Sequence, residues 1–136
     1  MLYSKKVLDH FKNPRNQGKM LNPDAISQVG NPVCGDIMKI YLKIDKKSNK
    51  IEDIRFETLG CGAAIACSSV VTESAKGKTL TNALKLDKNT ILKKLGGLPA
   101  QKVHCSMLSI EALHEAINDY LKKTNAEKNR KSNRKN

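Results

Sequence analysis

Hydrophobic residues recur at helical spacing close to the N-terminus. Tyr3, Val7, His10 and Phe11 fall near one face when the chain is drawn as a helix, which predicts a short helix over residues 3–11. Pro14 then ends the helical pattern, because the residue before a proline disfavours helical backbone angles. The chain therefore opens with one short amphipathic helix and a loop.

Three stretches with the period of a β-strand follow. Residues 25–29 are a candidate first strand. In residues 37–44 four aliphatic side chains point one way, and Lys39 and Lys43 point the other, as in a half-buried strand. Residues 51–59 alternate in the same manner after a short polar link, which indicates an antiparallel hairpin.

The pattern changes to a period of 3.6 residues from Ala63 onward. It predicts a helix that Gly77 closes, a short helix over residues 88–95, and a last helix over residues 104–121 with the clearest apolar stripe. Residues 98–102 are expected to be extended or turned. This order predicts an α+β fold, a small three-stranded antiparallel sheet with helices packed mainly on one face.

Charge is distributed unevenly along the 136 residues, which carry a formal net charge of +12. Half of this excess lies in residues 122–136, where seven basic residues face a single acid. Residues 124–136 contain one apolar residue, Ala126, and too little apolar surface to offset the entropy of ordering. We therefore expect one domain over residues 1–123 and a basic, disordered tail over residues 124–136. The tail is interpreted first as a solubilising segment, since no aromatic residue is interleaved to stack on bases.

Composition also predicts where the protein works. No apolar run approaches the roughly 18 residues that a membrane span needs, and the first residues resemble neither a secretory signal nor a transit peptide. We expect a cytoplasmic protein with no membrane partner. Four cysteines in such a chain do not indicate a disulfide framework, which leaves metal binding, sulfur chemistry or burial.

Three of the cysteines stand at predicted element boundaries, beside other residues that can bind metal. Cys34 and Asp36 precede the second strand, Cys61 lies between the third strand and the next helix, and His104 and Cys105 open the last helix. Thiolate and imidazole suit zinc or iron, whereas a carboxylate binds a soft metal more weakly. Five candidate ligands for a four-coordinate site predict a site that exchanges ligands and releases its cargo.

The remaining candidates have simpler interpretations. Cys67 falls within an apolar helical stripe and is expected to be a small buried residue. His10 is expected to be a packed or surface histidine near the first helix. His114 is expected to be a solvated position on the last helix. By contrast, Cys61 and Cys105 lie at predicted helix N-termini, where the partial positive charge favours a thiolate.

At these residues the sequence resembles the IscU family of iron–sulfur cluster assembly scaffolds, which is related to the N-terminal domain of NifU. The resemblance spans residues 2–121, nearly the whole predicted domain. It rests on the opening segment over residues 3–16 and on three ligand motifs, over residues 31–36, 60–69 and 98–106.

The resemblance implies a scaffold, not an enzyme in its own right, that builds a labile [2Fe–2S] cluster and passes it to apo-proteins. It implies that Cys34, Cys61 and Cys105 are thiolate ligands and that Asp36 and His104 are exchangeable ones. Sulfur would arrive as a persulfide from a cysteine desulfurase, with Cys105 as first acceptor. An electron donor such as ferredoxin would take part, and zinc would occupy the site when no cluster is present.

One segment departs from the family pattern. The family's chaperone-recognition segment reads Leu-Pro-Pro-Val-Lys, whereas this chain has Leu98-Pro99-Ala100-Gln101-Lys102. Binding to an Hsp70-type chaperone is therefore left open.

Two rival functions remain. The first is a zinc-dependent sulfurtransferase of the SufU kind, but that branch carries an insertion between the second and third cysteines and lacks the preceding histidine. Here Cys61 and Cys105 are 44 positions apart and His104 is present. The second is a basic nucleic-acid-binding module with a structural zinc, which the surplus of ligands disfavours.

Overall fold

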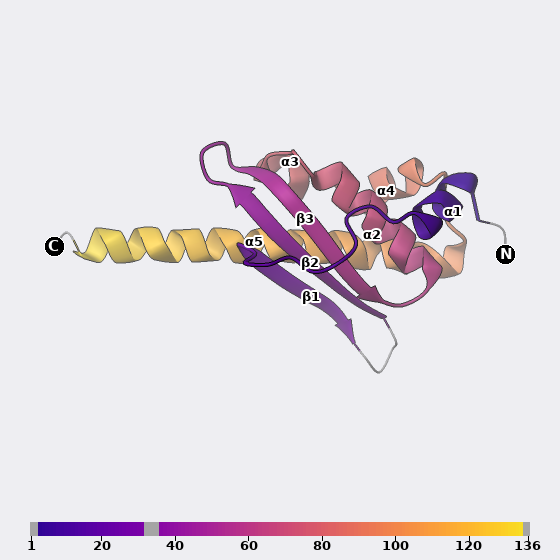
Figure 1. The fold of residues 1–136 in the computed structure, drawn as a ribbon, viewed down its shortest axis with the longest axis horizontal. Coiled ribbons are helices and arrows are strands. Elements are labelled where there is room, and N and C mark those ends of the chain that lie inside the picture. The colour runs from indigo at the N-terminus through magenta and orange to yellow at the C-terminus, as the bar shows by residue number, and fades with distance from the viewer. Residues whose placement is uncertain (1–2, 32–35, 135–136) are drawn as a thin grey trace.

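The computed structural model describes residues 3–31 and 36–134. A three-stranded antiparallel sheet in the order β1-β2-β3 is packed on one face by helices, with α2 and α5 nearest the strands (Figure 1). The predicted fold class is confirmed. The strands are β1 (Ala25–Asn31), β2 (Asp36–Asp45) and β3 (Lys50–Leu59), and the helices are α1 (Lys5–Lys12), α2 (Gly62–Ala75), α3 (Leu80–Leu84), α4 (Lys88–Lys94), the 3-10 turn η2 (Ala100–Lys102) and α5 (Val103–Arg134).

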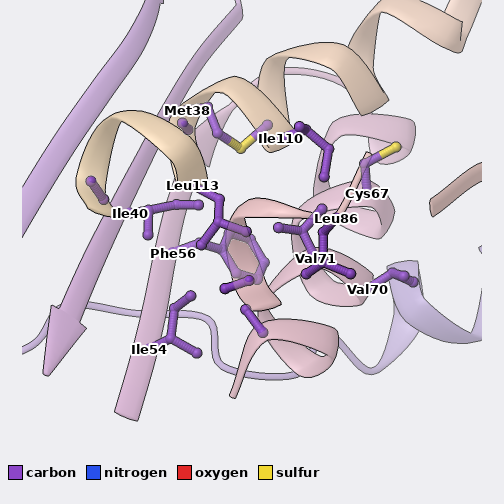
Figure 2. Packing of buried hydrophobic residues seen from close by; sticks show 14 of the residues in the cluster. Met38, Ile40, Ile54, Phe56, Cys67, Val70, Val71, Leu86, Ile110 and Leu113 are labelled. Atoms are coloured by element: carbon purple, nitrogen blue, oxygen red, sulfur yellow. The ribbon is translucent and has the colours of Figure 1, made fainter. Parts of the chain in front are cut away.

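The alternation in the strands explains why only one face of the sheet is covered. Every second residue of β2 from Met38 to Ile44 is buried, while Lys39 and Lys43 point to the open face. Phe56 of β3 is fully buried, and its ring lies beside Leu113 of α5 (Figure 2). The hydrophobic core therefore lies between the sheet and the α2–α5 layer.

The free side of β3 is capped by irregular segments. Asn16 O accepts a hydrogen bond from Phe56 N–H, and Gly18 N–H donates to Phe56 O. Further along the strand, Ile51 N–H donates to Lys78 O, and Gly77 N–H donates to Ile51 O. These contacts satisfy backbone groups that an edge strand would otherwise expose.

Two elements differ from those predicted. The sequence pattern did not reveal α3, a five-residue helix too short to display a period, although Thr79 accepts a hydrogen bond from Asn82 N–H as its N-cap. The final helix continues to Arg134, through residues expected to be disordered. The added residues include strong helix formers such as Ala126, Glu127 and Lys128, with no glycine or proline to stop the helix.

The extended α5 has 32 residues and is about 48 Å long at the rise of an α-helix. Its C-terminal part projects beyond the sheet and the other helices (Figure 1). The described residues include no helix both long enough and apolar enough to span a bilayer.

Candidate metal–sulfur site

Four of the five predicted ligands meet at one end of the sheet. The register of β2 and β3 places Ile37 opposite Leu59, so Asp36 and the turn that carries Cys61 are neighbours. The first turn of α5 brings His104 and Cys105 to the same end. Cys34, the fifth predicted ligand, lies outside the described residues.

The side chains form a chain of close contacts. Cys61 Sγ and Cys105 Sγ are 3.8 Å apart, and Cys105 Sγ is 3.8 Å from His104 Nε2. His104 Nε2 is in turn 3.3 Å from Asp36 Oδ2. The described cysteines, Cys61, Cys67 and Cys105, are all free thiols. Residues 68 positions apart in the sequence, Asp36 and His104, thus come together beside a pair of sulfurs.

The hydrogen bonding of His104 favours metal binding through Nε2. Its Nδ1 lies 3.1 Å from the carbonyl oxygen of Gln101, which can only accept, so Nδ1 carries the proton in the neutral ring. Nε2 is then an unprotonated nitrogen that faces the Asp36 carboxylate. Nε2 and the Asp36 oxygen are both acceptors, so at this distance they need a proton or a metal ion between them. A hydrogen bond from Nδ1 to a carbonyl oxygen is the usual way in which the ring of a metal-binding histidine is held in orientation.

Cys61 is the more exposed and the more acidic of the two paired thiols. It is the N-cap residue of α2. Burial would raise the pKa of Cys61, but the backbone N–H groups of Ala64 and Ala63, the Cys105 thiol and the Lys102 ammonium outweigh it, so the pKa lies below its usual value. A thiolate at this position is the form that binds metal and attacks sulfur.

Cys105 behaves in the opposite way. Its side chain is buried, and burial together with the negative charge of Cys61 raises the pKa of Cys105 to about 12. The pair therefore carries one proton more readily on Cys105 than on Cys61. Metal binding would change this, since a coordinated thiol is deprotonated outright.

Lys102 is a site residue whose charge the sequence reasoning did not use. The negative charge of the Cys61 thiolate raises the pKa of Lys102 above its usual value, so the ammonium stays protonated beside the sulfur. Lys102 lies in the η2 turn, two residues before His104, and this closeness in sequence to a candidate ligand could have indicated that its charge acts on the site. Lys102 gives the sulfur pair a cation that remains when no metal is bound.

Gly60 lets the carboxylate of Asp36 approach the turn before Cys61. A Cβ at position 60 would lie 2.9 Å from Asp36 Oδ1 and 3.2 Å from the Ala64 side chain. Any side chain here would push Asp36 away from its place.

The sulfur pair has the spacing of metal ligands, although the set is not a closed cage. Two thiolates on a tetrahedral zinc with Zn–S bonds of about 2.3 Å are about 3.8 Å apart, which matches the Cys61–Cys105 separation. Within residues 3–31 and 36–134, no three or more His, Cys, Asp or Glu side chains converge tightly enough to form a ready metal cage. The arrangement is a row of pairwise contacts that would have to move closer together to hold an ion.

Three other candidates lie away from this arrangement. Cys67 is fully buried in α2, and burial raises the pKa of Cys67 far above its usual value, which confirms the interpretation as a small core residue. His10 is packed against α2, where its Nδ1 lies 2.7 Å from Ser69 Oγ. His114 is half-buried, not solvated, because its Nε2 contacts the carbonyl oxygen of Leu86.

The chain is similar to proteins named as assembly scaffolds. The model of the NifU-like N terminal domain matches residues 2–127. A protein of Archaeoglobus fulgidus named iron-sulfur cluster assembly scaffold protein IscU 1 is 57% identical over 122 residues, which cover 90% of this chain and 78% of the relative. The IscU of Aquifex aeolicus is 52% identical over 89% of this chain and 77% of its own, and that of a Buchnera aphidicola subspecies is 48% identical over 92% and 98%.

Solved structures agree with the fold. A protein of Fervidobacterium islandicum described as an assembly scaffold for the SUF system has a TM-score of 0.70 and 27% identity, over 85% of this chain and 96% of its own. A NifU-like N-terminal protein of Brucella abortus has a TM-score of 0.73 over 88% and 94%, and at 21% identity it supports the fold alone. With a family model that covers nearly its whole length and relatives more than 45% identical, this chain belongs to the family of NifU-like N-terminal domains.

Proposed function

We propose that this protein is a scaffold on which a [2Fe–2S] cluster is assembled and then passed to apo-proteins. The observation that carries the proposal is the meeting of Cys61, Cys105, His104 and Asp36 at one end of the sheet. The names of the IscU relatives support the same function. The protein is a carrier in this proposal, and the bond-making chemistry comes from iron, sulfur and partner proteins.

The donor set suits a cargo that must leave. Cys34, Cys61 and Cys105 supply the soft thiolates that hold iron–sulfur clusters. Asp36 and His104 compete for the last position, since Nε2 and Oδ2 are only 3.3 Å apart. The carboxylate forms the weaker bond to a soft centre, so this position opens first when a recipient's thiolate arrives.

Sulfur transfer needs a donor that carries sulfane sulfur, and a cysteine desulfurase is the class of enzyme that forms it. In the proposed step a scaffold thiolate attacks the terminal sulfur of the donor's persulfide. A new S–S bond forms on the scaffold, the S–S bond of the donor breaks, and the donor thiolate leaves. We assign this role to Cys105, whose raised pKa means that its proton must leave before the attack, as happens when a metal ion binds the thiol.

Reduction must follow before the sulfur can enter a cluster. Each persulfide needs two electrons to yield one sulfide and regenerate the cysteine thiolate, and we propose an electron donor such as ferredoxin as their source. Zinc is the proposed occupant of the same ligands when no cluster is present, as the Cys61–Cys105 spacing would allow. We propose that the protein works in the cytoplasm. Because the Leu98–Lys102 segment departs from the family's chaperone-recognition segment, binding to an Hsp70-type chaperone is left open.

The test is anaerobic reconstitution with ferrous iron, cysteine, a reductant and a cysteine desulfurase. We expect a visible absorption and circular dichroism spectrum of a [2Fe–2S] cluster, with iron and sulfide in equal amounts on the desalted protein. Cys61→Ser and Cys105→Ser variants should lose the spectrum, while Cys67→Ser, which alters a buried core thiol, should retain it.

The zinc-dependent alternative predicts a different outcome. A sulfurtransferase would retain zinc throughout, pass sulfane sulfur to an acceptor and show no cluster spectrum. That result would overturn the scaffold proposal, as would a cluster that survives in the Cys61→Ser and Cys105→Ser variants.

A further inference from the structure

A small apolar groove lies between α1 and the start of α2, next to the metal–sulfur site but separate from its ligands. Its volume is about 230 Å³, and it is lined by Tyr3, Val7, Leu8, Phe11, Gly62 and Ala63. The last two residues directly follow Cys61 in the sequence. Whatever fills the groove therefore touches the first turn of the helix that Cys61 caps.

Two large apolar side chains of α1 stay exposed at this groove. Leu8 is 40% exposed and Phe11 is 45% exposed. Both belong to α1, a helix of eight residues. They are three positions apart and so lie on the same side of the helix. The Phe11 ring nevertheless rests on the backbone of Gly62, where a Cβ would come within 3.0 Å of it. One side of the ring is packed, and the other is left for a partner.

Contacts near the two ends of α1 hold the groove in place. Ser4, the N-cap residue, accepts a hydrogen bond from Val7 N–H and donates one to the carbonyl oxygen of Leu95. His10 is anchored to Ser69 of α2. A binding surface that is already formed costs less ordering entropy when a partner docks.

The rim of the groove is basic. Lys5 and Lys12 are exposed and stand three residues before and four residues after Leu8, so both lie beside it on the helix. Asp9, the one acid of α1, is already paired with Arg15 at 2.8 Å. In the part of the chain that the structure describes, Lys5 and Lys12 take part in no salt bridge. The rim therefore presents positive charge that is free to pair with a partner.

We propose that this groove is a docking site for an acidic amphipathic helix of a partner protein. The volume is below the roughly 300–1,000 Å³ of ordinary small-molecule sites and suits one or two anchoring side chains. An apolar floor with a basic rim selects an apolar anchor flanked by Asp or Glu, as in other complexes where a helix lies in a groove. Docking here places the partner beside Cys61 without occupying a ligand.

The proposal can be tested with a defined peptide and metal-free protein. The probe is a fluorescein-labelled helical peptide with leucine at positions i, i+3, i+4 and i+7 and glutamate and alanine elsewhere. Fluorescence anisotropy should show saturable binding to the full-length chain that weakens as salt is raised. A matched peptide with lysine in place of glutamate should bind at least about tenfold more weakly.

Variants of the protein locate the binding site. Leu8→Glu and Lys12→Glu should each weaken peptide binding, the first by about tenfold or more. Leu21→Glu is the matched control, because Leu21 is an apolar residue that is 91% exposed in a loop outside the groove, and it should bind as the wild type does. Lys12→Glu alters only an exposed side chain, so it keeps the test valid if Leu8→Glu disturbs folding.

Four results would overturn the proposal. The peptide could fail to bind, or bind Leu8→Glu and Lys12→Glu as tightly as wild type. The lysine peptide could bind as well as the glutamate peptide, which would remove the electrostatic argument. Finally, sedimentation could show a dimer that Leu8→Glu dissociates, in which case a second copy of the chain is the occupant. None of these results bears on cluster assembly, so the proposed function would stand or fall separately.

Discussion

At the scale of single residues, Asp36 is the proposed ligand whose chemistry would decide how long cargo stays bound. Its carboxylate oxygen lies 3.3 Å from His104 Nε2, so the imidazole of His104 could take the same coordination position in place of the carboxylate. Replacing Asp36 with alanine removes the harder and weaker ligand and leaves the stronger one. We predict that a cluster assembled on Asp36→Ala persists several-fold longer than on wild type, measured as decay of visible absorption after addition of a chelator.

The matched control for Asp36→Ala is Asp119→Ala. Asp119 is partly exposed on α5, where it pairs with Lys123, and its replacement should leave the lifetime of the cluster unchanged. An Asp36→Ala scaffold that loses its cluster faster than wild type would show that the carboxylate holds the cargo and does not release it.

The two paired cysteines differ enough to be told apart by experiment. Cys61 has a lowered pKa and partial exposure, whereas burial raises the pKa of Cys105 to about 12. If Cys105 is the acceptor, a bound metal ion must first deprotonate it. We predict that mass spectrometry of the zinc-loaded protein after reaction with a desulfurase finds persulfide on Cys105, and that removing zinc lowers its yield several-fold.

Persulfide that appears on Cys61 instead, with or without zinc, would move the acceptor role to the thiol that is already acidic. Cys105→Ser then serves as the control, since it should block transfer only if Cys105 accepts first.

At the scale of elements, the β1–β2 hairpin positions Asp36 through one glycine. Gly30 has φ +104 and pairs with Ile37, and a Cβ there would lie 2.1 Å from the backbone oxygen of Asp36. Gly30→Ala must therefore move the backbone that carries Asp36, a proposed ligand. We predict a loss of about 1–3 kcal/mol in the free energy of unfolding and weaker zinc binding, measured by denaturant titration and by competition with a chromogenic chelator.

Gly18→Ala is the matched control for Gly30→Ala, because it separates the effect of backbone strain from the effect of a steric clash. Gly18 has φ +129, but a Cβ at this position would meet no atom of the described residues within 4 Å. Alanine there adds backbone strain only and should leave zinc binding intact. Equal loss of zinc affinity in the two variants would contradict the role given to Gly30.

The junction of α1 and α2 is sensitive to pH through His10. Burial, and then the charge of Arg15, lower the pKa of His10 below its unfolded value, while Glu73 and Asp9 oppose this more weakly. The folded state thus binds fewer protons than the unfolded state, so the free energy of unfolding falls as pH drops through the unfolded pKa of about 6.5. We predict that His10→Gln flattens this fall between pH values of about 7 and 5 in denaturant titrations. An unchanged slope would place the pH dependence elsewhere.

At the scale of the whole molecule, the sequence pattern was enough to predict the architecture but not the electrostatics of the site. The alternation of Met38 to Ile44 and the helical stripes depend on local periodicity, and the observed sheet and α5 follow them. The meeting of Asp36 with His104 and the protonation order of Cys61 and Cys105 depend on strand register and burial, which no local pattern contains. A family resemblance could name these candidate ligands, whereas the electrostatic effect of the Cys61 thiol on Lys102 depends on the folded arrangement.

The projecting end of α5 raises the remaining question of how the whole molecule uses its charge. Among the described residues, the hydrophobic core and the side chains packed on it extend along α5 only as far as Leu121. Residues 124–136 hold five basic residues and Glu127, so removing them lowers the formal net charge from +12 to +8. Because this core is left whole, we predict that the chain ending at Lys123 melts within about 2 °C of the full chain and assembles a cluster equally well. It should elute from a heparin column at lower salt, since the tail contributes long-range electrostatic attraction to acidic surfaces. A fall in melting temperature of more than about 5 °C would show that the α5 extension stabilises the domain and does more than add positive charge.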